Sequence, residues 1–271
     1  MTFDQLLVEL DKRGVELKKF NSDLFIRGSR EVLDLGLKEF VRLHKSTLLD
    51  LLGRDVDQWW STPSVITPSM LPLVTLNAEQ IAAIIAQVPG GAGNVQDIYP
   101  LAPLQEGIFF HYLMADQGDP YLSSGLMAFD SRERLDGYLR AMQAVVDRHD
   151  VLRTAIFWEG LPEPVQVVLR RVILPIEEVE LEGEGDAAEQ LYARFDLRHS
   201  RIDLRQAPLL RLHIAYDAGQ KRWLLLMLIH HLTTDHVSLE LLLEEVRMHL
   251  LGRGEELPAP IPFRNYVAHA R

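Results

Sequence analysis

The spacing of apolar residues divides the start of the chain into short helices and strands. Residues 2–10 carry apolar side chains at helical spacing, and Val15–Phe20 and Leu24–Arg27 are two short, partly apolar runs on either side of turn-forming residues. Helical spacing returns over 31–52. We therefore predict a small αββαα domain over residues 1–55.

The next segment, residues 56–94, begins without a regular hydrophobic period. Three prolines and several Ser and Thr residues between positions 54 and 76 give it the composition of a linker. Asn77 is suited to cap a short helix, and the run PGGAGN at 89–94 is suited to end it. We predict a linker with one short helix.

A steady alternation of helical and strand patterns begins at Val95. The pattern predicts helices over 103–115, 133–149, 186–198 and 237–250, and strands over 122–129, 152–160, 165–169, 172–181, 209–216 and 222–229. The last two strands are expected to form a hairpin. This alternation of helices and antiparallel strands predicts an α+β sandwich over 95–271.

Composition places the chain among ordinary soluble proteins, with 47% hydrophobic and 25% charged residues in a length that suits about two domains. No apolar run approaches the roughly 20 residues that a bilayer span needs. Acidic residues near the N-terminus argue against a signal peptide. The chain has no cysteine, which excludes disulfides and thiolate metal ligands and agrees with a cytoplasmic location.

The formal net charge of −11 is unevenly distributed. Residues 1–55 hold equal numbers of basic and acidic side chains, so the whole excess of acidic groups lies in residues 56–271. A surface of this sign repels nucleic acid. We expect neither nucleic acid nor a membrane as a partner.

The greatest concentration of reactive side chains is HHLTTDH, residues 230–236, which directly follows the apolar run Trp223–Ile229. A zinc site of the HExxH kind needs histidines at i and i+4 on one helix, whereas His231 and His236 are five apart across a loop. The chain has no G-x-S-x-G elbow for a serine nucleophile, and no glycine-rich loop beside a lysine for phosphate. The chemistry that fits is a histidine general base.

A purely structural interpretation of the same residues is also open. Asp235 is suited to cap the helix expected after it, and His230 is suited to the core, as the last residue before the loop. Spacing alone does not decide between the base and this structural interpretation.

HHLTTDH resembles the HHxxxDG signature of condensation domains in non-ribosomal peptide synthetases. That family has a chloramphenicol-acetyltransferase-like fold, which implies a mixed sheet with flanking helices for this lobe. Two further segments resemble that family's motifs in the same order: DIYPLAPLQEGIFFH at 97–111 is similar to its opening motif, and RHDVLRTAIF at 148–157 to its second. The resemblance covers 95–271, the N-terminal lobe alone. Since the family's active site lies between two lobes, we expect this piece to be inactive by itself.

The resemblance also implies roles for the signature residues. His231 matches the histidine that deprotonates or positions the acceptor amine attacking a donor thioester, whereas His230 and Asp235 match residues with mainly structural roles. His236 stands where most relatives have glycine, which puts the usual geometry in doubt. The substrates implied are aminoacyl or peptidyl groups on the phosphopantetheine arms of upstream and downstream carrier proteins, so no cofactor is expected to bind this chain directly.

A second resemblance concerns FHYLMADQGD at 110–119, which is similar to the HHxLxxxxGD sequence of dual epimerisation/condensation domains. His111 and Asp119 match that pattern, and Phe110 departs from it. The resemblance implies that the upstream residue is epimerised before it is joined, with His111, Asp119 and His236 as subtype-specific candidates.

Residues 1–53 are similar to the tubulysin-type N-terminal docking domains that begin some synthetase proteins. In those domains a hairpin accepts the C-terminal peptide of the upstream protein as an added strand. The residues that this resemblance assigns to peptide binding are Lys18, Lys19, Leu24, Phe25, Ile26 and Arg27. Two alternatives remain open: a docking scaffold without activity of its own, and a lobe of an epimerisation domain, which shares the histidine signature.

Overall fold

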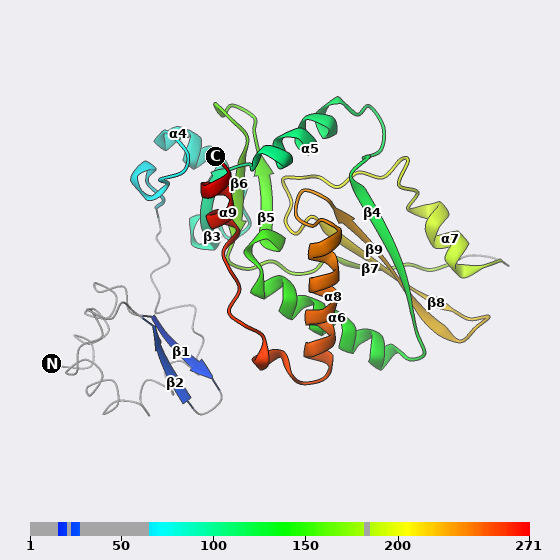
Figure 1. The fold of residues 1–271 in the computed structure, drawn as a ribbon. Helices are drawn as coiled ribbons and strands as arrows, with labels where there is room; N and C mark the ends of the chain where they lie inside the picture. The colour runs from blue at the N-terminus through cyan, green and yellow to red at the C-terminus, as the bar shows by residue number, and fades with distance from the viewer. Residues whose placement is uncertain (1–15, 21–22, 28–64, 182–184) are drawn as a thin grey trace. The chain divides into compact units, whose positions relative to one another are not determined.

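The computed structural model describes residues 16–20, 23–27, 65–181 and 185–271, and the chain divides into two units, Met1–Thr62 and Pro63–Arg271. In the first unit, β1 (Glu16–Phe20) pairs antiparallel with β2 (Asp23–Arg27), and Lys18 lies opposite Phe25 (Figure 1). The predicted hairpin is confirmed. The helices predicted on either side of it lie outside the described residues.

The second unit contains the α+β part of the chain. Its helices are α4 (Ala78–Ile85), α5 (Pro103–Met114), α6 (Arg132–Arg148), α7 (Ala187–Arg194), α8 (His236–Leu250) and α9 (Phe263–Ala270), with short 3₁₀ turns at Pro68–Met70, Gly91–Asn94, Asp150–Arg153 and Gly254–Glu256. Its strands are β3 (Val95–Pro100), β4 (Leu122–Phe129), β5 (Thr154–Phe157), β6 (Val165–Leu169), β7 (Ile176–Glu178), β8 (Leu210–Asp217) and β9 (Arg222–His230).

These strands form two sheets. One has the order β3-β6-β5 and is antiparallel throughout, and the other has the order β4-β9-β8-β7, in which only β7 and β8 run parallel. The predicted β8–β9 hairpin is confirmed. β4 pairs with β9 along its whole length, from Leu122 opposite His230 to Phe129 opposite Trp223. The register brings the residues before β4 to the end of β9.

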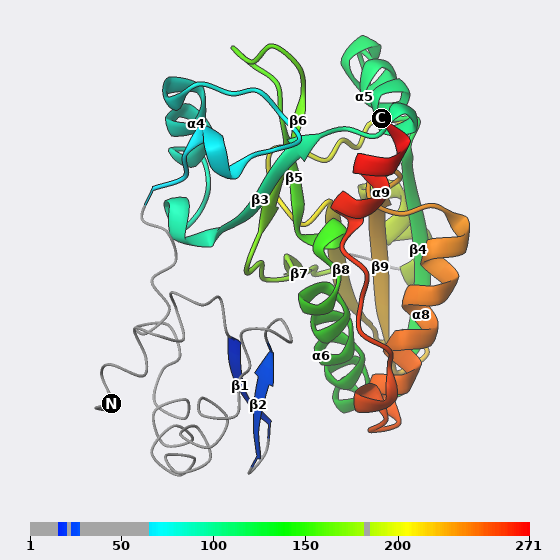
Figure 2. The same cartoon turned by 60° about the vertical axis from the view of Figure 1, so that its left-hand side comes forward.

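Strand β9 is covered on both faces, as its apolar run without polar alternation suggests. Leu225, Met227 and Ile229 join the core cluster that includes α6 and α8, whereas Leu224 and Leu226 join the cluster that includes α5 and α7. Figures 1 and 2 show α6 and α8 side by side on one face of this four-stranded sheet. The strand that ends in the histidine pair is therefore among the most enclosed elements of the unit.

The segment expected to be a linker differs from its prediction where the structure describes it. Ile66, Leu71, Val74 and Leu76 are buried in the main core cluster, so this stretch packs as part of the second unit. Prolines disfavour regular structure there, but they do not prevent apolar side chains from being buried. The expected short helix is confirmed as α4, with a capping box between Asn77 and Gln80.

Several element boundaries also differ from the predicted ones. The strand expected over 172–181 is limited to β7, an exposed edge strand preceded by Pro175. Helix α7 stops at Arg194, because Asp196 accepts a hydrogen bond from the Arg198 N–H and so favours a turn. The strand expected from residue 152 begins only at Thr154, after a 3₁₀ turn.

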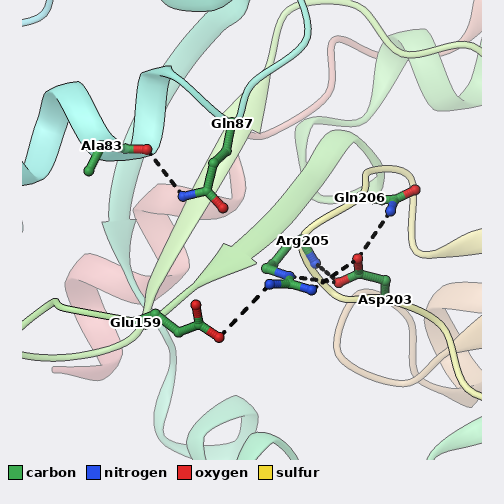
Figure 3. Close-up of polar contacts among 6 residues, drawn as sticks. All are labelled: Ala83, Gln87, Glu159, Asp203, Arg205 and Gln206. Carbon is green, nitrogen blue, oxygen red and sulfur yellow. Dashed lines mark hydrogen bonds and ion pairs between the residues drawn. The ribbon is translucent and has the colours of Figure 1, made fainter.

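In the loop before β8, Asp203 is bonded to its neighbours, and Arg205 lies 3.9 Å from Glu159, which follows β5 (Figure 3). Asp203 accepts hydrogen bonds from the Arg205 N–H at 3.1 Å and from Gln206 Nε2 at 3.0 Å. The carbonyl of the fully buried Leu204 accepts from the Ile156 N–H at 2.7 Å, which joins the loop to β5. This loop therefore links one sheet to the other.

The described part of the chain has neither a membrane-spanning helix nor a cluster of metal-ligating side chains. Among residues 65–181 and 185–271, no helix has the length and apolar character needed to cross a bilayer. In the same described residues, no three His, Cys, Asp or Glu side chains gather in a way that could hold a metal ion.

Candidate active site

The two histidines at the end of β9 lie on opposite faces of the sheet. His230 pairs with Leu122 and its side chain is completely buried. The N–H of His231 donates to the Tyr121 carbonyl at 2.9 Å, so the ladder continues for one residue, and the His231 side chain is exposed. Successive side chains of a strand point to opposite faces, which explains why adjacent histidines have different environments.

The His231 ring is held through both of its nitrogens. Nδ1 lies 3.0 Å from the Thr234 carbonyl oxygen, and Nε2 lies 2.8 Å from Ser123 Oγ. A carbonyl only accepts, so Nδ1 carries the hydrogen, and in the neutral ring Nε2 is the acceptor for the Ser123 hydroxyl. In the neutral form of the ring, the accepting nitrogen lies on the exposed side, where a general base needs it.

Ser123 and Thr234 are contacts of this ring that the sequence pattern did not indicate. Ser123 pairs with Ile229, two residues before His231, so the Ser123 and His231 side chains lie on the same face of the β4–β9 pair. Diagonal neighbours across a strand pair are within reach of long side chains such as histidine. The strand pattern over 122–129 contained this signal, but using it requires the β4–β9 register, which no local feature of the sequence specifies.

The backbone just after His231 is clamped on two sides. The Leu232 N–H donates to His230 Nδ1 at 3.0 Å, and the Leu232 carbonyl accepts from Gln105 Nε2 at 2.7 Å. Gln105 is itself buried on α5 and exchanges hydrogen bonds with the buried Gln166 of β6. Gln105 belongs to LAPLQEG, so the opening motif supports the loop that holds the exposed histidine.

His230 and Asp119 form a buried pair beneath this loop. His230 Nε2 lies 2.8 Å from Asp119 Oδ2, both side chains are fully enclosed, and the contact is not aligned as a linear hydrogen bond. Asp119 Oδ1 accepts from the Tyr121 N–H at 2.9 Å. Burial alone raises the pKa of Asp119, but His230, the Tyr121 N–H and Arg201 together bring its pKa below the usual value. The carboxylate therefore stays charged at neutral pH.

Asp235 has the position of a helix cap. Its Oδ1 accepts from the Ser238 N–H at 2.7 Å at the start of α8, and its side chain is otherwise exposed. The hydrogen bonds with Ser238 hold the pKa of Asp235 below its usual value. This geometry agrees with the structural interpretation of Asp235 and of His230, while His231 has the exposed position that a base requires.

The remaining subtype candidates lie in different places. His236 is 85% exposed, and its Nε2 lies 3.2 Å from Glu240 Oε1 on the same helix. His111 is exposed on α5, with its ring centroid 5.9 Å from that of Tyr121, and Phe110 beside it is 59% exposed. His111 therefore lies beside Tyr121, which packs against the cluster that includes α5 and α7, and Asp119 is enclosed.

The second motif ties helices together. Arg148 Nε and His149 Nε2 contact the same oxygen of Glu245 on α8, at 3.0 Å and 2.7 Å. Asp150 accepts from the Phe263 N–H at the start of α9. These contacts fix α8, whose first turn follows the histidine loop, against the end of α6.

The mixed sheet with flanking helices is a chloramphenicol-acetyltransferase-like fold. A family model described as Condensation domain matches residues 95–271. The chain belongs to this family, the condensation domains of non-ribosomal peptide synthetases, as the three sequence motifs predict.

Relatives agree with this assignment, and a solved structure has a similar fold. The chain is 54% identical over 213 residues to malpinin synthetase of Mortierella alpina (78% of this chain, 3% of that protein) and 51% identical over 209 residues to malpibaldin synthetase of the same organism (77% and 4%). It therefore spans only a few per cent of these relatives. The EpoB NRPS cyclization-docking bidomain from Sorangium cellulosum has a similar fold, with a TM-score of 0.52 and 22% identity over 98% of this chain and 48% of that one.

Proposed function

We propose that this chain supplies the catalytic-histidine lobe for amide-bond formation between aminoacyl or peptidyl thioesters on carrier proteins. The observation that supports the proposal is the ring of His231, exposed, with Nδ1–H held by the Thr234 carbonyl and Nε2 left as the basic nitrogen. The substrates arrive on the phosphopantetheine arms of partner proteins, so this chain itself needs no cofactor.

For amide-bond formation, this lobe mainly has to supply a general base in a fixed position. The acceptor amine attacks the thioester carbonyl carbon, a C–N bond forms, and the C–S bond breaks to release the carrier thiol. His231 takes the proton that the amine loses and returns it to the departing sulfur. An amine with a pKa close to that of imidazole makes such a transfer efficient. The clamps on Leu232 and on the ring hold the base in place before substrate arrives.

Replacing His231 with alanine in the synthetase that contains this chain tests the proposal. We expect the rate of peptide-bond formation to fall about 10²- to 10⁴-fold, the usual contribution of a general base. The measurement is product formation from loaded carrier proteins, with chirality analysis of the upstream residue in the same assay. His269→Ala, at an exposed histidine on α9, is the matched control and should retain full turnover. Wild-type turnover by folded His231→Ala would mean that this ring only packs.

For the first unit we propose docking of the upstream protein's C-terminal peptide. The described hairpin offers β1 and β2 as a two-stranded sheet to which a peptide strand can be added. The bidomain that aligns with nearly all of this chain is described as cyclization-docking. The positive charges of Lys18 and Lys19 favour a peptide with an acidic end.

A titration of acidic upstream C-terminal peptides against the chain checks the docking proposal. We expect saturable binding that weakens as salt is raised and is lost in the double variant Lys18→Glu, Lys19→Glu, because attraction between opposite charges in water is screened by ions. His231→Ala is the control and should bind as the wild type does. Binding that is indifferent to both salt and the lysine changes would contradict this recognition mode.

A further inference from the structure

The hydroxyl of Ser123 occupies the one nitrogen that the proposed base needs. Ser123 Oγ lies 2.8 Å from His231 Nε2, while Nδ1 is already engaged by the Thr234 carbonyl at 3.0 Å. A neutral imidazole has a single acceptor nitrogen. An incoming amine therefore meets Nε2 with its lone pair already bound to the serine proton.

The serine and the histidine are fixed on the same strand pair. Ser123 pairs with Ile229 in the β4–β9 ladder, and the N–H of His231 extends that ladder to the Tyr121 carbonyl. The ring is held at its far nitrogen by Thr234. Because both backbones belong to one hydrogen-bonded ladder, the contact between Oγ and Nε2 is preorganised and depends little on loop motion.

Ser123 Oγ also has the capacity to contact a substrate. The side chain is partly exposed, and a hydroxyl that donates one hydrogen bond still has two lone pairs with which to accept others. An amine N–H that approaches Oγ can therefore be bound while the Oγ–Nε2 hydrogen bond remains in place. With an amine bound in this way, a continuous path of hydrogen bonds would run from the amine through Ser123 Oγ to His231 Nε2.

We propose that Ser123 is a further catalytic residue that relays the amine proton to His231; this inference rests on the proposed function. As the amine nitrogen bonds to the thioester carbon, its proton passes to Ser123 Oγ and the serine proton passes to His231 Nε2. The C–S bond then breaks, and the thiolate is protonated through the same path in reverse. Serine and histidine both return to their starting forms, and no other reactant is consumed.

The test compares three variants of the synthetase in the loaded-carrier assay. Ser123→Ala removes the relay and should lower kcat at least about 10-fold with KM unchanged, because a general-base pathway is lost while the binding surface is kept. Ser123→Thr retains a hydroxyl and should recover most of the rate. Ser124→Ala is the matched control, since the neighbouring side chain points to the other face of β4 and should stay close to wild-type turnover.

A solvent deuterium experiment separates a relay from mere positioning. With two protons in flight the rate depends on the deuterium fraction along a curve, and with a single proton the dependence is linear. We expect a curve for the wild type and for Ser123→Thr, and a straight line for Ser123→Ala. An unchanged curve in a slowed Ser123→Ala would overturn the relay, because the serine would then only orient the ring.

The relay and the proposed function fail in different ways. Full or increased turnover by Ser123→Ala, together with an inactive His231→Ala, would overturn the relay and show that the amine reaches Nε2 directly. Full turnover by folded His231→Ala would instead overturn the proposed function, and the relay with it. A rate lost in both variants and restored by Ser123→Thr supports both.

Discussion

Replacing Asp119 with alanine is expected to destabilise the second unit by about 2–5 kcal/mol, because two enclosed hydrogen-bond donors lose the acceptor that faces them. The change leaves His230 Nε2 and the Tyr121 N–H without the carboxylate that now faces them, in a place where both side chains of the pair are fully enclosed. Chemical denaturation of the chain measures the loss. Asp119→Asn keeps the shape and an acceptor oxygen, and it should cost less than the alanine variant.

The charge of Asp119 also predicts that the stability of the second unit falls at acid pH. Its pKa in the folded chain lies below its usual value, so its contribution is fully present above the unfolded-state pKa of about 4 and is lost as pH falls through the folded value. Wild-type stability should therefore decline as the pH falls below about 4, and part of this decline should be absent from Asp119→Asn. Equal acid dependence in the two proteins would show that the charge is not engaged with His230.

The same variant bears on the dual epimerisation/condensation subtype. Asp119 is enclosed and contacts His230, which is the position of a structural residue, whereas the HHxLxxxxGD resemblance implies a subtype-specific role for it. His111, exposed beside Tyr121, is better placed to meet a substrate. In a synthetase that epimerises the upstream residue, retained epimerisation by a folded Asp119→Asn would mean that this aspartate supports the loop and takes no part in the proton transfer.

The exposed histidine could be predicted from the sequence because its signals are local. The apolar run of β9, the period of a strand and the three ordered motifs are all contiguous in the chain, and they led to His231. The residues that support it from distant parts of the chain could not be assigned to it in this way. Ser123 and Gln105 are more than a hundred positions from the loop they contact, and only pairing between distant elements brings them to it.

Local patterns also failed where one residue type fits two environments. The GD aspartate at 119 matches a subtype motif and equally suits a buried partner for histidine, and burial is a property of the assembled fold. Residues 66–76 have the proline content of a linker, yet their apolar side chains find the core. In both cases the local sequence left two roles open, and tertiary packing decided between them.

Replacing Arg153 with methionine is expected to destabilise the second unit by about 3–5 kcal/mol, because the guanidinium is the main donor to a set of enclosed acceptors. Arg153 is only 6% exposed and donates to the Val146 carbonyl at 3.2 Å, to Gln96 Oε1 at 2.9 Å and to the carbonyl of Leu169. It thus joins α6, β3 and the end of β6. Urea denaturation monitored by circular dichroism measures the change.

The matched control for this prediction is Arg134→Met, which removes an exposed arginine of α6. Arg134 pairs with Asp130 at 3.1 Å, with both side chains about two-thirds exposed or more, so its loss should cost less than about 1 kcal/mol. Arg153→Lys should not rescue, since one ammonium cannot reproduce the forked donors that reach several carbonyls. Burial lowers the pKa of Arg153, while Asp150 and Asp147 act in the opposite direction. Equal losses of stability in the Arg153 and Arg134 variants would contradict this prediction. Arg153 of the second motif would then not be the residue that joins α6 to the strands, and a role in the chemistry of the site would have to be tested instead.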